Sequence, residues 1–92
     1  MRKYVIEREI PSVGKMTDEQ FCAAAGKSNG VISDLAPDVQ WVESYVADDR
    51  LFCVYLAESE ELVEKHANIS GFPATRIVPI RRTIDPLTAA AA

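Results

Sequence analysis

The stretch VQWVESYVADDRLFCVYLA, residues 39–57, decides the fold of this chain. Its two halves, Val39–Ala47 and Arg50–Ala57, are rich in β-branched and aromatic residues, which favour strands. Only Asp48 and Asp49 separate the two halves, and a two-residue connection is typical of a tight hairpin. The stretch therefore predicts two antiparallel strands in the middle of the chain.

A helix is expected on each side of this hairpin. Before the hairpin, Thr17 precedes Gln20 with the spacing of a capping box, and apolar residues then recur at helical intervals to about Leu35. After the hairpin, Ser59 can cap a second helix, and Gly71 stands where a C-terminal cap belongs.

Two further strands are predicted near the ends of the chain. Lys3–Glu9 has the alternation of a strand and is followed by chain-breaking Pro and Gly residues. Thr75–Arg82 forms the last strand, and we expect it at a sheet edge because Pro79 cannot donate a hydrogen bond to a neighbouring strand. These elements make one domain over residues 1–82, and residues 83–92 are expected to be a flexible tail.

The predicted order of elements identifies the fold class. Strand, helix, strand, strand, helix, strand is the ferredoxin-like βαββαβ order of an α+β protein. We therefore expect an antiparallel four-stranded sheet with both helices on one face.

The other face of the sheet is expected to combine large aromatic side chains with carboxylates. Side chains alternate between the two faces of a strand, and we assign one alternate set to the helices: Tyr4, Ile6, Val42, Val46, Phe52, Val54 and Leu56. The opposite face then carries Val5, Glu7, Glu9, Trp41, Glu43, Tyr45, Leu51, Cys53 and Tyr55. Because an exposed sheet seldom shows so many aromatic groups, we expect a second copy to cover this face. The two copies would form a homodimer of the dimeric α/β-barrel type, in which the two sheets face each other.

Composition argues against several classes of partner. The 92 residues carry a formal net charge of -4 and a pI near 4.9, whereas nucleic-acid binding draws on clustered Lys and Arg. No apolar run reaches the roughly 20 residues of a membrane-spanning helix, and charges interrupt the N-terminal segment, unlike a signal peptide. We therefore expect a cytoplasmic protein with no nucleic-acid or membrane partner, in which Cys22 and Cys53 stay reduced.

The sequence contains none of the common catalytic signatures. Phosphate-binding glycine loops, zinc-protease and hydrolase motifs, and the CxxC pair are all missing. No spacing marks a nucleophile either, so no residue is assigned as catalytic, and a binding protein is favoured over an enzyme.

Four segments resemble a known family: VIEREIP (5–11), VQWVESYV (39–46), LFCVYLAES (51–59) and EKHANISGFPATRIVPI (64–80). They are similar to small, mostly bacterial ferredoxin-like proteins of unknown function that include a nickel-binding, nickel-responsive actinobacterial member. The resemblance spans about Lys3 to Ile80 and includes the H-x4-G-x-P segment from His66 to Pro73. It implies a ferredoxin-like subunit, a dimer formed through the sheet and, in one member, Ni²⁺ binding.

His66 and Cys53 are candidate ligands for nickel or another divalent transition metal. His66 is the only histidine, and imidazole is a natural ligand for nickel. It also shares a helical stripe with Leu62 and Ile69, so a packed core histidine is the alternative. Cys53 is a soft ligand when ionised and a space-filling side chain otherwise.

Glu7, Glu9 and Glu43 are the carboxylate candidates for the same metal site. All three are expected on the open face, where they could act as hard ligands or as an acid–base cluster. The alternative is that they pair with Arg8, Lys3 or Arg76 at the rim of a dimer.

These candidates support a leading hypothesis and two alternatives. The leading one is a small cytoplasmic homodimer that binds nickel or a similar divalent metal through Glu7, Glu9, Glu43, Cys53 and His66. The second is a dimeric barrel, an enzyme or a binding protein, in which an apolar or aromatic molecule is held by Trp41, Tyr45 and Tyr55. The third is a structural or regulatory partner module without a site.

Overall fold

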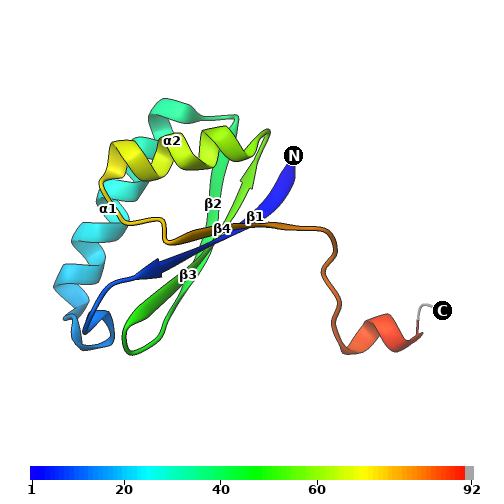
Figure 1. The fold of residues 1–92 in the computed structure, drawn as a ribbon, viewed down its shortest axis with the longest axis horizontal. Coiled ribbons are helices and arrows are strands. Elements are labelled where there is room, and N and C mark those ends of the chain that lie inside the picture. Colours follow the sequence, from blue (N-terminus) through cyan, green and yellow to red (C-terminus); the bar gives the residue numbers. More distant parts are fainter. Residues whose placement is uncertain (91–92) are drawn as a thin grey trace.

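The computed structural model describes residues 1–90, and these contain four strands and two α-helices in the predicted order (Figure 1). The strands are β1 (Arg2–Glu9), β2 (Val39–Val46), β3 (Arg50–Ala57) and β4 (Arg76–Ile80). The helices are α1 (Asp18–Leu35) and α2 (Glu60–Ser70), and two short 3-10 helices are η1 (Val13–Lys15) and η2 (Pro86–Ala90).

The four strands form one antiparallel sheet in the order β2-β3-β1-β4. Both α-helices lie on the same side of this sheet (Figure 1). The structure is therefore the predicted ferredoxin-like α+β fold. Strand β4 occupies an edge, which agrees with the position expected from Pro79, although it is shorter than the predicted Thr75–Arg82.

Both helices have the caps that the sequence predicts. The Gln20 backbone N–H donates to Thr17 Oγ1 at 3.2 Å, and the Thr17 N–H donates to Gln20 Oε1 at 2.9 Å, which completes a capping box. At the other helix, Ser59 Oγ accepts from the Leu62 N–H, and Gly71 closes α2 in the left-handed conformation with φ of 75°.

The loop after β1 packs tightly on the β2–β3 hairpin. Gly14 donates its backbone N–H to the Asp48 carbonyl at 2.9 Å. A Cβ atom at Gly14 would lie 2.7 Å from the Ala47 carbonyl oxygen, so this close approach requires glycine. The contact fixes the loop that forms one wall of a cavity between α1 and the sheet.

Strand β3 faces the opposite way from our expectation. Tyr55 pairs directly with Tyr4, and Cys53 pairs with Ile6, so these four side chains share the helix-covered face. The prediction that Phe52, Val54 and Leu56 point at the helices is therefore wrong, as is the placing of Leu51, Cys53 and Tyr55 on the open face. The reason is that Leu51–Leu56 is apolar on both faces, and only pairing with β1 decides between them.

A β-bulge changes the faces of β2. Trp41 pairs with Tyr55, whereas Glu43 pairs with the next residue of β3, Val54, so Val42 is an extra residue in the strand. Trp41 therefore points toward the helices, contrary to expectation, while Glu43 and Tyr45 lie on the open face as predicted. Val42, expected in the core, is 50% exposed.

The hydrophobic core lies between the sheet and α2. Its buried members are Tyr4, Ile6, Val39, Cys53, Tyr55, Ala57 and Val63. Helix α1 contributes partly buried residues such as Ile32 and Leu35 near its C-terminal end. Its N-terminal half stands away from this core, and that arrangement leaves space next to the sheet.

The chain beyond β4 runs away from the sheet to η2 (Figure 1). Residues 81–90 are all exposed, and the last two residues of the predicted tail, 91 and 92, lie outside the described part. None of the helices within residues 1–90 combines the length and the hydropathy that a membrane crossing requires.

Candidate ligand cavity

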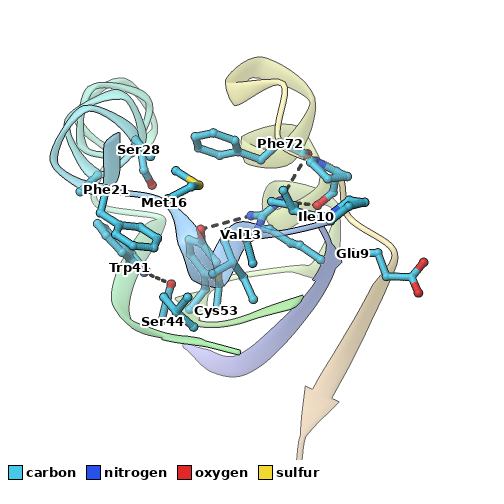
Figure 2. Close-up of a pocket in the computed structure, with 18 residues that line it drawn as sticks. Glu9, Ile10, Val13, Met16, Phe21, Ser28, Trp41, Ser44, Cys53 and Phe72 are labelled. Carbon is cyan, nitrogen blue, oxygen red and sulfur yellow. Dashed lines mark hydrogen bonds between the residues drawn. The ribbon is translucent and has the colours of Figure 1, made fainter. Parts of the chain in front are cut away.

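A cavity of about 690 Å³ lies between the N-terminal half of α1 and the helix-facing side of the sheet (Figure 2). The loop from Ile10 to Met16 and the segment Phe72–Pro73 after α2 close its other sides. The aromatic side chains of Phe21, Trp41 and Phe72 surround the space. This volume is in the range of ligand pockets, roughly 300–1,000 Å³.

The cavity exists because α1 presents small side chains to the sheet. Ala24, Ala25 and Ser28 are the residues of α1 that line it beyond Phe21. Three such side chains cannot fill the distance between a helix and a sheet, which are usually separated by larger residues. Our sequence reasoning missed this site. A helical stripe made of Ala and Ser in place of Leu or Ile was the signal that could have indicated it.

Within residues 1–90, Arg8 is the only charged side chain among the fully buried residues, with 1% of its surface exposed. It lines the cavity from β1. Its Nη1 donates to the Pro73 carbonyl at 2.8 Å and to the Phe72 carbonyl at 3.3 Å, and Nη2 donates to Tyr55 Oη at 3.3 Å. The guanidinium therefore joins β1, β3 and the segment after α2 at the cavity wall.

Trp41 and Tyr55 place two further polar groups along this wall. Trp41 Nε1 donates to Ser44 Oγ at 3.0 Å (Figure 2). The hydrogen-bond acceptor of the indole therefore comes from the same strand, β2. Burial raises the pKa of Tyr55, and the nearby Arg8 charge only partly opposes this. The Tyr55 hydroxyl therefore stays protonated at neutral pH.

His66 lies behind the cavity wall and is fully buried. Its ring is 5.0 Å from that of Tyr55 between centroids, and its Nε2 is 3.2 Å from Ser28 Oγ. Burial, reinforced by the Arg8 charge, lowers the pKa of His66 from 6.5 to about 4, while a hydrogen bond with the Ser28 backbone opposes the shift. His66 is therefore neutral at pH 7.

The Ser28–His66 contact has the geometry of a nucleophile beside a base, but its chemistry suits binding better. A base with a pKa of about 4 is too weak to take a serine proton efficiently at neutral pH. Within residues 1–90, His66 Nδ1 has no hydrogen-bond partner that would orient the ring. The contact therefore serves to hold α1 on α2.

The lowered pKa of His66 predicts a specific loss of stability in acid. Below pH 6.5 the unfolded chain binds a proton that the folded protein does not bind until about pH 4. The free energy of unfolding should therefore decrease as the pH is lowered from about 6.5 to about 4, by roughly 3 kcal/mol in all. His66→Leu should remove this part of the slope, and it should lower stability at pH 7 by about 1–3 kcal/mol because the buried Ser28 hydroxyl loses its partner. Urea denaturation of the wild type and His66→Leu from pH 4.5 to 7.5 measures this pH dependence. If the free energy of unfolding varies with pH in the same way in both proteins, His66 is not the group responsible.

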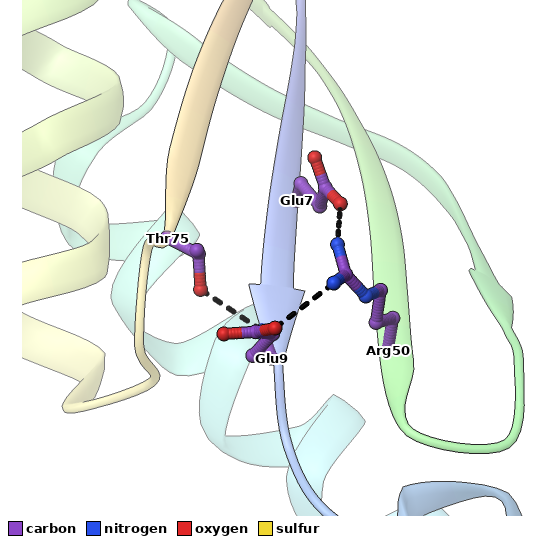
Figure 3. A network of polar contacts seen from close by, with 4 residues as sticks. All are labelled: Glu7, Glu9, Arg50 and Thr75. Atoms are coloured by element: carbon purple, nitrogen blue, oxygen red, sulfur yellow. Dashed lines mark hydrogen bonds and ion pairs between the residues drawn. The ribbon is translucent and has the colours of Figure 1, made fainter.

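The predicted ligand residues Glu7 and Glu9 lie on the opposite side of the sheet. Arg50 of β3 forms an ion pair with each of them, with 2.9 Å between Arg50 Nη2 and Glu9 Oε1 (Figure 3). The Glu9 backbone N–H donates to Thr75 Oγ1 at 2.9 Å. These carboxylates therefore pair with Arg50, which differs from Arg8, Lys3 and Arg76, the three cations expected to pair with them at a dimer rim.

The other predicted residues are divided between the two faces. Glu43 and Tyr45 are exposed on the open face, where the Glu43 carboxylate raises the pKa of Tyr45 through a hydrogen bond and its charge. Trp41, Tyr55 and Cys53 line the cavity. The structure therefore does not bring Glu7, Glu9, Glu43, Cys53 and His66 together. No three His, Cys, Asp or Glu side chains within residues 1–90 of one chain form a group that could hold a metal ion.

The fold and the cavity define a ferredoxin-like α+β protein with a ligand-sized space between its first helix and its sheet. The chain belongs to the family described as "Nickel responsive protein SCO4226-like", whose sequence profile matches residues 4–80. Among solved structures, the crystal structure of SCO4226 from Streptomyces coelicolor A3(2) is similar, with a TM-score of 0.74. The two chains are 16% identical, and the match covers 89% of this chain and 99% of that one, which supports the fold. A comparison with curated proteins gives no match.

Proposed function

We propose that this protein binds a small, largely apolar organic molecule in the cavity between α1 and the sheet. The observation that carries the proposal is the cavity itself, which is of ligand size and has aromatic walls and a few fixed polar groups. The weak basicity of His66 favours binding over proton transfer. The proposal keeps Trp41 and Tyr55 as binding residues and leaves out Tyr45, which lies on the other face.

Trp41 provides a direct optical test of this proposal. It is the only tryptophan of the chain and it lines the cavity, so its fluorescence should respond to a bound aromatic molecule. We expect saturable quenching by naphthalene-1-carboxylate or by 1-naphthalenemethanol, with a dissociation constant below about 1 mM, or at least 4 kcal/mol of binding free energy. If neither compound gives a saturable change, the proposal is wrong.

Nickel binding is the second candidate function, and family membership favours it. The described residues of one chain do not form a suitable ligand group, so we propose that a site would need Glu7, Glu9 and Glu43 from two copies of the open face. Cys53 and His66 are buried on the helix side and are left out of this proposal.

Calorimetric titration with NiCl₂ tests the nickel proposal. We expect heat with a dissociation constant below about 1 mM in the wild type, and at least tenfold weaker binding in Glu7→Gln/Glu9→Gln, because metal-bound carboxylates carry much of the affinity. His66→Leu is the control and should bind nickel as the wild type does. If His66→Leu loses nickel binding and Glu7→Gln/Glu9→Gln keeps it, the nickel site lies on the helix-covered face, near His66.

We also propose that the protein is a cytoplasmic homodimer formed through the open face of the sheet. This face includes Val5, Glu7, Glu9, Glu43, Tyr45, Arg50, Phe52, Val54, Leu56 and Val78, as strand pairing places them. Its centre is an apolar row across three strands, and a monomer would leave that row in water. Both cysteines are free, which agrees with a reducing compartment.

A further inference from the structure

The buried charge of Arg8 has no opposite charge beside it within residues 1–90. Its three hydrogen bonds all go to neutral acceptors, namely two backbone carbonyls and the Tyr55 hydroxyl. The ion pairs in this part of the chain both belong to the exposed Arg50. A guanidinium that is 1% exposed and lacks a counter-charge is unfavourable unless another group supplies one.

Among the described residues that line the cavity, no side chain is in a position to supply that negative charge. Glu9 borders the cavity, but its carboxylate turns outward and binds Arg50 (Figures 2 and 3). His66 is neutral, and Tyr55 keeps its proton. A second positive charge also lies near Phe72, because Lys27 Nζ and Arg8 Cζ lie 5.4 Å and 5.7 Å from the centre of the Phe72 ring.

Arg8 also retains the capacity to bind an anion. A guanidinium has five N–H donors, and the three hydrogen bonds use three of them. Its planar fork matches a carboxylate better than an ammonium group does. A charge-assisted hydrogen bond inside a cavity walled by aromatic rings is stronger than the same bond in water.

We propose that the cavity ligand carries a carboxylate, which pairs with Arg8 while the apolar body of the ligand contacts Trp41, Phe21 and Phe72. The inference rests on the proposed function and narrows its ligand to apolar carboxylic acids, whether aromatic or aliphatic. The structure assigns Arg8 as the residue that recognises the acidic group, and Tyr55 as the residue that holds the guanidinium in place.

Two ligands of nearly equal shape test this assignment. Naphthalene-1-carboxylate and 1-naphthalenemethanol differ chiefly in the charge of one substituent, and both can be titrated against Trp41 fluorescence. We expect the wild type to bind the carboxylate at least tenfold more tightly, which corresponds to about 1.4 kcal/mol. Arg8→Met should abolish this preference, and Arg50→Met, which alters an arginine on the other face, should keep it.

The outcomes separate this inference from the proposed function. Equal binding of the two compounds to the wild type would overturn the role of Arg8 and leave the cavity as a binding site. Failure of both compounds to bind would overturn both proposals. The wild-type comparison decides the matter even if Arg8→Met does not fold, which circular dichroism would reveal. A carboxylate preference that persists in folded Arg8→Met would also contradict the assignment.

Discussion

Ala25→Phe is expected to abolish ligand binding in the cavity, with a loss of affinity of at least a hundredfold, or about 2.7 kcal/mol. Ala25 lines the cavity from α1, and a phenyl ring at this position would occupy space that the ligand needs. The protein should stay folded, because the ring enters an existing space and contacts apolar walls. Trp41 fluorescence titration with naphthalene-1-carboxylate measures the effect.

Ala23→Phe is the matched control for this experiment. Ala23 lies two residues earlier on the same helix, is exposed and does not line the cavity. The substitution has the same helix propensity cost and adds the same ring, but it should leave affinity unchanged. Equal affinities of Ala25→Phe and Ala23→Phe would place the ligand elsewhere.

Phe52→Asp is expected to convert the proposed homodimer into a monomer, with a dimer dissociation constant raised by about a thousandfold or more. Phe52 lies at the centre of the open face, between Glu7 on β1 and Tyr45 on β2. A carboxylate buried there would lie beside Glu7, and the neighbouring Arg50 already pairs with Glu7 and Glu9, so repulsion and desolvation would be poorly compensated. Light scattering should give twice the 10.1 kDa chain mass for the wild type and the single mass for the variant.

Ile69→Asp controls for the introduction of a charge at an apolar position. Ile69 is 52% exposed on α2, in the helix layer and away from the open face. This variant should keep the dimer mass. A monomeric wild type at micromolar concentration, or a dimeric Phe52→Asp, would show that the open face is not the interface.

Much of the fold could be predicted because local chemistry determines it. The capping box at Thr17 and Gln20, the cap at Gly71 and the short turn of the hairpin each depend on a few neighbouring residues. Pro79 indicated the edge position of β4 for the same reason. The positions of Glu7 and Glu9 on the open face followed from clear alternation within β1.

The faces of β2 and β3 could not be predicted, because no local signal sets them. Both alternating sets of β3 are apolar, and the bulge at Val42 shifts Trp41 relative to Glu43 without requiring a special residue. This error moved Trp41, Tyr55 and Cys53 to the wrong side of the sheet. It also combined the candidate ligands into one site, whereas the structure divides them between two faces.

The cavity and the lack of a counter-charge for Arg8 could not be predicted, because each depends on the absence of particular side chains: large residues on α1, and a carboxylate near Arg8. The small side chains of Ala24, Ala25 and Ser28 leave a cavity only because the fold holds α1 at a distance from the sheet that they cannot fill. That distance is a property of the whole fold. Arg8 could be placed on the helix-facing side of β1 by alternation. Its lack of a carboxylate partner becomes visible only when every neighbouring element is in position.

The most direct test of the account is a measurement of ligand position by nuclear Overhauser effects in the complex with naphthalene-1-carboxylate. The account predicts contacts between the naphthalene protons and the side chains of Trp41, Phe21 and Phe72, which surround the cavity. Contacts to Tyr45 and Phe52 on the open face, with none to the cavity residues, would contradict it.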